Sequence, residues 1–218
     1  MNPMRSLASQ NIRKFKTTVD NGQIVVPSTG VYLQQLYGNI MEIDNSAGNN
    51  FAGIGMQNAL RSLYEEYRID AIKFTFVPLS TQSTQGSATA GQVAYAINRA
   101  PWSGFPTSMI DILRQNDCKV FNSTRGFAVT VRKPAWGAVE SENGVVSGAA
   151  IKDIAATTKH TWCSTRDYSL VSGGTSQPYW YGCDLCINGF PGSAIPYHLY
   201  KTYYITFVND FNTRATNL

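Results

Sequence analysis

Two cysteines three positions apart, Cys183 and Cys186, are the strongest candidates for metal chemistry in this sequence. A structural zinc ion takes four ligands, which two Cys-x-x-Cys pairs commonly supply. The chain has four cysteines and two histidines in total, and no second pair of this spacing. In a strand, side chains three positions apart point to opposite faces, so these thiols should diverge. We therefore expect no metal site, with Cys183 buried and Cys186 more exposed.

Covalent catalysis would need a nucleophile beside a base, and the sequence offers weak candidates for one. Cys163 is close to His160 along the chain, but no Gly-x-Ser-x-Gly elbow occurs. Neither Gly53-Ile54-Gly55 nor Gly173-Gly174 belongs to the Gly-Lys-Ser/Thr sequence of a phosphate-binding loop. We expect neither an enzyme nor a bound cofactor.

The first 19 residues carry four basic side chains and no acid: Arg5, Arg13, Lys14 and Lys16. The other 14 of the 18 basic residues are balanced by 14 acidic ones, so the net charge of +4 resides in this segment. A basic segment on a neutral body favours a polyanionic partner. We expect these four residues to bind phosphates of nucleic acid without reading its sequence, and more weakly as salt rises. Lys73 and Arg125 are further candidates for the same surface.

Charged residues make up 15% of the 218 residues, whereas about 25% is usual. Aromatic residues are abundant at 12%. Surfaces that contact other subunits are depleted in Lys and Glu and enriched in aromatic residues. This composition predicts that much of the surface faces neighbouring copies of the chain, while 43% hydrophobic residues suffice for a core.

The length suits one β domain. We expect a basic arm at residues 1–19 that runs into the first strand, followed by a jelly-roll shell domain at residues 20–218. Residues 1–10 lack the apolar core of a signal peptide, and no apolar run approaches the ~18 residues needed to span a membrane. With few cysteines, the default site of synthesis is a reducing, intracellular one.

Short runs of alternating apolar and polar residues predict strands throughout the chain. They lie at residues 13–19, 23–26, 31–40, 68–79, 93–97, 118–123, 127–131, 159–164, 179–187 and 200–208. On the run at 179–187, Tyr179, Tyr181 and Cys183 should share a face with Leu185 and Ile187. Asp20-Asn21-Gly22 is a strong turn signal between the first two runs.

Two segments have helical patterns, 58–67 and 108–115, and the second begins with a capping pair, Ser108 and Asp111. Polar segments at 80–90, 135–156 and 171–178 indicate long loops. About eight strands with helices as inserts predict an all-β fold, a single eight-stranded antiparallel jelly roll with two short helical inserts.

Four features resemble the coat proteins of circoviruses and related circular, Rep-encoding single-stranded DNA viruses. A short helix at 58–67 runs into a strand, 68–78, that closes with an aromatic residue and a proline. The segment 127–134 resembles a mid-chain strand of the family, and Trp162 falls near its downstream tryptophan. The segment 200–211 resembles the last strand. The family usually begins with a long arginine-rich arm, so here the arm is either short or trimmed.

The resemblance implies a capsid protein of which about 60 copies form an icosahedral shell around single-stranded DNA. It places the protein in the virion, after synthesis in the host cell and passage through the nucleus. The resemblance leaves the host receptor or glycan unknown, and it implies no contact with a membrane. The alternative from the fold pattern is a jelly-roll carbohydrate-binding module or a trimeric ligand. A third alternative, an enzyme on a β-sandwich, has no recognisable site.

Overall fold

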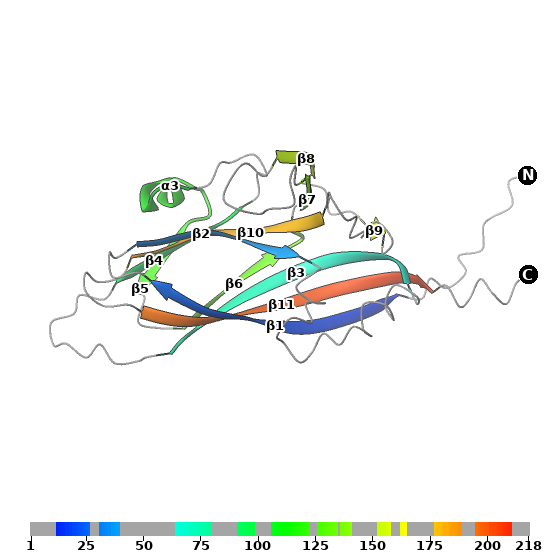
Figure 1. Cartoon of the computed structure of the whole chain (residues 1–218), viewed down its shortest axis with the longest axis horizontal. Coiled ribbons are helices and arrows are strands. Elements are labelled where there is room, and N and C mark those ends of the chain that lie inside the picture. Colours follow the sequence, from blue (N-terminus) through cyan, green and yellow to red (C-terminus); the bar gives the residue numbers. More distant parts are fainter. Residues whose placement is uncertain are drawn as a thin grey trace, which may run out of the picture.

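In the part of the chain that it describes, the computed structural model consists almost entirely of antiparallel strands arranged as two facing sheets (Figure 1). It describes residues 12–26, 31–39, 64–79, 91–98, 106–122, 126–134, 136–140, 152–157, 162–164, 177–188 and 195–210. No helix within these stretches is long and apolar enough to cross a membrane.

The first sheet has the strand order β1-β11-β3-β6. Its strands are β1 (Arg13–Val26), β11 (Ile195–Asp210), β3 (Tyr64–Pro78) and β6 (Phe127–Arg132). A short strand, β9 (Cys163–Ser164), pairs with the beginning of β3. The earliest and latest of the described strands, β1 and β11, are therefore neighbours in one sheet.

The second sheet is built around β10, which pairs with β2 along one edge and with β4 along the other. Its strands are β2 (Val31–Asn39), β10 (Gln177–Asn188), β4 (Gln92–Ile97), β5 (Lys119–Asn122), β7 (Trp136–Glu140) and β8 (Lys152–Thr157). Tyr179 pairs with both Asn39 of β2 and Gly137 of β7, so β7 continues the edge that β4 occupies.

Two four-stranded sheets, β1-β11-β3-β6 and β2-β10-β4-β5, therefore form the frame, and the remaining short strands extend it. Eight antiparallel strands in two facing sheets make a jelly roll. The predicted fold class is confirmed. The strands β7 and β8 lie in the segment 135–156, which was predicted to be a loop, so that prediction is wrong for both strands.

The core lies between the two sheets and follows the predicted alternation. Ile72, Phe74 and Phe76 of β3 are buried against aromatic and aliphatic side chains of β10 and β11. On β10 the predicted alternation is broken by a register shift between Tyr181 and Cys183. Trp180, rather than Tyr181, joins the core cluster, so the prediction that Tyr181 shares the face of Cys183 is wrong. Tyr179 has no described side chain.

The predicted turn at Asp20-Asn21-Gly22 is wrong, because β1 continues through it. The register with β11 shifts between Asp20 and Gln23, as in a β-bulge. Gly22 takes a φ of +78°, a conformation that favours glycine, and its N–H donates to Asp20 Oδ1 at 2.8 Å. The turn residues therefore bend one long strand instead of separating two.

Of the two predicted helices, the second is confirmed and the first is wrong where it can be tested. α3 (Met109–Leu113) is capped by Ser108 and Asp111 in a reciprocal capping box. Tyr64–Tyr67, expected to end the first helix, open β3 instead, and residues 58–63 lie outside the described residues. Within the predicted strand 159–164, Cys163–Ser164 form β9, and residues 159–161 are not described. Of the predicted loop 171–178, Gln177 and Pro178 belong to β10, while residues 171–176 and the predicted loop 80–90 are not described.

A second, smaller cluster holds α3 against the outside of the second sheet. Ile112 is buried there together with Cys186 and two alanines of β4. Beside it, the Asp184 carboxylate is 1% exposed and accepts hydrogen bonds from the side-chain amides of Gln35 at 3.1 Å, Asn98 at 3.4 Å and Gln115 at 2.8 Å. Three amide donors thus compensate for the burial of the carboxylate and join the residues after α3 and β4 to β2 and β10.

Candidate nucleic-acid interface

The outer face of the first sheet, which points away from the second sheet, gathers basic and aromatic side chains from all four strands. We call it the basic face. Its residues alternate along each strand with the buried core residues, so Lys73 on β3 points outward between Ile72 and Phe74. Because paired residues of antiparallel strands share a face, the strand registers define rows of side chains across it.

One row runs Lys16, Tyr204, Ala71, Arg132 across β1, β11, β3 and β6. At about 4.8 Å per strand, the Cα atoms of Lys16 and Arg132 are roughly 14 Å apart. The Lys16 ammonium lies 5.9 Å from the centroid of the Tyr204 ring. The row therefore sets an aromatic ring between two cations.

The next row along the sheet is Thr18, Thr202, Lys73, Thr130. The hydroxyls of Thr18 and Thr202 are hydrogen-bonded to each other at 3.0 Å. Hydroxyl groups and a lysine at the centre of a sheet are groups that commonly contact phosphate and sugar. This row thus extends the polar, basic character of the face away from Tyr204.

The positive charge of the face is not neutralised by the ion pairs that the structure gives for it. Arg68 pairs with Asp70 at 3.0 Å, and His198 Nε2 lies 2.5 Å from Asp20 Oδ1. Within the described part of the chain, neither pair uses Lys14, Lys16, Lys73 or Arg132, which are four further cations of the face beside Arg68. Three of them are exposed and Lys73 is half-buried. Such a surface attracts polyanions.

The four residues predicted to bind nucleic acid have different positions. Lys14 and Lys16 lie on the basic face, paired with Thr206 and Tyr204. Arg13 is paired with Phe207, a core residue, so it belongs to the opposite face of β1, although its position at the strand end leaves it exposed. Arg5 lies outside the described residues.

Lys73 was a candidate from the sequence, and the structure places it on the basic face, whereas Arg125 lies outside the described residues. Arg132 and Tyr204 were not predicted. A sequence signal for both exists, because each stands out of phase with the buried residues beside it, Val131 and Tyr203. The signal gives the face of each residue but not its neighbours.

Two further aromatic contacts occur at the ends of the face. The rings of His198 and Tyr200 are stacked with centroids 4.7 Å apart. The Arg68 guanidinium lies 4.4 Å from the centroid of the Trp162 ring.

The pKa of Asp20 is lowered, first by the hydrogen bond from the Gly22 N–H and then by His198. Its carboxylate is therefore ionised at neutral pH and accepts the hydrogen bond that stabilises the bulge in β1.

The cysteine side chains that the structure describes do not form a chemical site. Cys183 is buried in the core between the sheets and Cys186 is buried under α3, so they diverge as predicted, but the expectation that Cys186 is exposed is wrong. Burial raises the pKa of both thiols, which disfavours the reactive thiolate. The described residues contain no group of three side chains able to hold a metal ion. His160 lies outside them.

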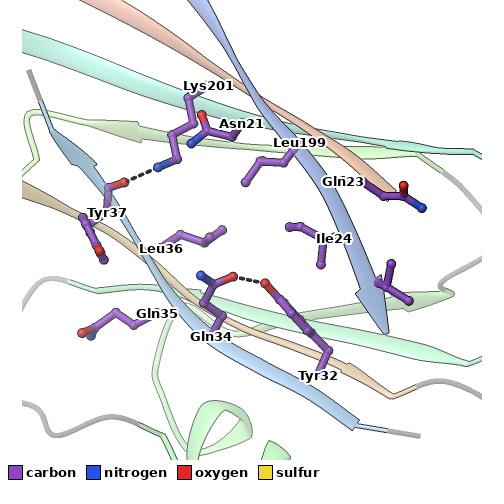
Figure 2. Close-up of a pocket in the computed structure, with 11 residues that line it drawn as sticks. Asn21, Gln23, Ile24, Tyr32, Gln34, Gln35, Leu36, Tyr37, Leu199 and Lys201 are labelled. Atoms are coloured by element: carbon purple, nitrogen blue, oxygen red, sulfur yellow. Dashed lines mark hydrogen bonds between the residues drawn. The ribbon is translucent and has the colours of Figure 1, made fainter. Parts of the chain in front are cut away.

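A cavity of about 400 Å³ lies between β1, β2 and β11 on the flank of the sandwich (Figure 2). Across it, Lys201 Nζ donates to the Tyr37 carbonyl at 2.9 Å and so joins the two sheets. Tyr32, whose pKa burial raises to about 12, donates its hydroxyl to Gln34. Lys201 alternates with Thr202 along β11, which places the cavity on the inner side of that strand, apart from the basic face.

A family model described as "Circovirus capsid protein" matches residues 4–209 of the chain. No curated protein matches it in sequence.

Among solved structures, the crystal structure of the 60-mer BFDV capsid protein matches with a TM-score of 0.64 and 15% identity, covering 93% of this chain and 96% of that one. The decameric BFDV capsid protein gives 0.57 and 15%, with 90% and 99% covered. A protein of Mud crab tombus-like virus gives 0.50 and 14%, with 96% and 94% covered. These likenesses confirm the fold.

Proposed function

Because the family model covers nearly all of its length, the chain belongs to the circovirus capsid protein family, and we propose that its copies assemble into a closed icosahedral shell around single-stranded DNA. The protein is a structural component of the virion and not an enzyme. The similar BFDV capsid protein forms a 60-mer, which supports a shell of about 60 copies here. The shared fold and the shared family together support this proposal.

Shell assembly needs surfaces that bury apolar area between copies. Ile110 and Leu113 on α3 are 57% and 46% exposed, and Val120 on the neighbouring strand β5 is 49% exposed. Exposed apolar side chains that cluster on one region often mark a protein contact. Together with the low charge content, they support repeated contacts between different surfaces of neighbouring subunits, which close into a shell when the symmetry closes.

Nucleic-acid packaging is proposed for the basic face, with Arg5 and Arg13 as further contacts at the start of the chain. The observation that carries it is the set of four cations, Lys14, Lys16, Lys73 and Arg132, for which the described residues provide no acidic partner. Contacts of this kind bind phosphates of any sequence. We assign the basic face to the interior of the shell, because the enclosed nucleic acid is negatively charged and would bind to a positively charged inner surface.

The test is electron microscopy of the purified protein with and without a single-stranded DNA circle, followed by nuclease digestion. We expect uniform particles, and DNA that resists the nuclease when it was present during assembly. Particles mixed with DNA after assembly serve as the control, since that DNA should be digested. A protein that stays monomeric at high concentration, in low salt and with DNA present would contradict the proposal.

We also propose that the newly made protein passes through the host nucleus. Clustered basic residues at Arg13, Lys14 and Lys16 are of the type that nuclear import receptors bind. A fluorescent protein joined to the full chain is expected to accumulate in nuclei, and the change of these three residues to Gln should leave it in the cytoplasm. Equal nuclear fluorescence from the two fusions would rule out this segment as a nuclear localisation signal.

A further inference from the structure

We propose that the basic face binds single-stranded nucleic acid in preference to duplex, because one base stacks on Tyr204 in the space beside Ala71. This inference rests on the proposed function, since it concerns the same surface. It assigns to the middle of the sheet a subsite for one nucleotide, flanked by Lys16 and Arg132. Neither Tyr204 nor Ala71 belongs to the basic arm of the sequence.

The first argument is the order of residues in the row. Tyr204 is flanked by Lys16 on β1 and by Ala71 on β3, with Arg132 beyond Ala71 on β6. Among the four residues of the row Ala71 has the smallest side chain, which leaves room for a base beside the ring. The bulged residue Asp70 next to it is held by Arg68 and Thr206. Lys16 and Arg132 flank Tyr204 and Ala71 in the row, where a positive charge favours the phosphates of a bound strand.

The second argument is the state of the ring itself. Tyr204 is half-buried, whereas Thr202 and Thr206, its neighbours on the same face of β11, are buried, and the Lys16 ammonium lies 5.9 Å from the centroid of the Tyr204 ring. In contrast, the Tyr200 ring four residues earlier is already stacked on His198. An aromatic ring next to cations is the arrangement with which proteins bind single strands, whose bases expose their flat faces.

The third argument concerns the form of the nucleic acid. In a duplex, bases are stacked on one another, and phosphates alone are offered to a broad sheet surface. A ring at the centre of the basic face can contribute nothing to duplex binding, whereas each stacked base of a single strand adds affinity. The cations can bind the phosphates of both forms, whereas the Tyr204 ring can stack only on a base of the single strand.

The test uses dispersed subunits of the full-length protein and a labelled 20-nucleotide oligothymidine, compared with a duplex of equal length at fixed salt. Ala71→Leu fills the space beside the ring, and Tyr204→Leu removes the ring while keeping an apolar side chain. We expect each change to weaken single-strand binding roughly tenfold and to leave duplex binding and the salt dependence unchanged.

The matched control is Ala128→Leu, which adds the same side chain at an exposed position of the same face, in the row of Tyr200 and Thr75. It should leave single-strand binding unchanged. Equal losses for single strand and duplex in Ala71→Leu, or no loss in either variant, would overturn the stacking subsite. If the unchanged protein binds neither form, the packaging part of the proposed function fails instead.

Discussion

Replacing Gly182 by Ala is expected to lower the free energy of unfolding of the subunit by about 3 kcal/mol. A Cβ atom at this position would lie 2.5 Å from the Leu36 carbonyl oxygen and 2.6 Å from Phe74 Cζ. Because the carbonyl belongs to the backbone of β2, relief requires the two strands to separate. In a domain of this size, such a change lowers Tm by roughly 6–12 °C. Thermal and denaturant unfolding of dispersed subunits measure it.

Gly22→Ala is the control for this prediction. Gly22 has no atom within 4 Å of an added Cβ, but its φ is +78°. The substitution therefore strains the backbone without a collision and should cost about 1 kcal/mol. A Gly182→Ala protein that is no less stable than Gly22→Ala would show that β2 and β10 are not packed as closely as described.

Changing Lys14, Lys16, Lys73 and Arg132 together to Gln is expected to weaken single-stranded DNA binding by roughly three orders of magnitude at 50 mM salt. Each cation that neutralises a phosphate releases counter-ions and adds about 0.7 to the slope of log affinity against log salt concentration. Four lost contacts should reduce that slope by about 2.8. Titrations of dispersed subunits at several salt concentrations measure both quantities.

The control separates position from total charge. The pair Lys14→Gln and Lys16→Gln should reduce the slope by about 1.4. The pair Arg114→Gln and Lys119→Gln removes the same charge from exposed positions at the C-cap of α3 and on β5, outside the first sheet, and should leave the slope unchanged. Equal reductions by both pairs would mean that binding follows net charge and not the basic face.

The sequence predicted those parts of the fold that depend on local alternation. Strands such as β3 and β11 follow it closely, because every second residue from Ile72 to Phe76 and from Tyr203 to Phe207 enters the core. The predictions failed at bulges, where one extra residue reverses the phase, as between Tyr181 and Cys183. They also failed at Tyr64–Tyr67, where pairing with β11 outweighs the local helical pattern.

The candidate site could be predicted in part. Lys14 and Lys16 stood out because acids are absent around them. The row from Lys16 to Arg132 could not be predicted, since it depends on the registers of strands that lie far apart in the sequence. Alternation shows that Lys73 and Tyr204 point outward, yet pairing across the sheet decides that Tyr204 has Ala71 as its neighbour.

The bulge in β1 bears on how copies of this protein avoid aggregation. β1 ends the order of the first sheet, so one side of its backbone could accept a strand from another molecule and begin a fibre. The bend after Asp20 and the lysines before it both hinder such growth. In an infected cell crowded with identical chains, growth by backbone pairing is thereby discouraged, and contacts through side chains can build a particle of finite size.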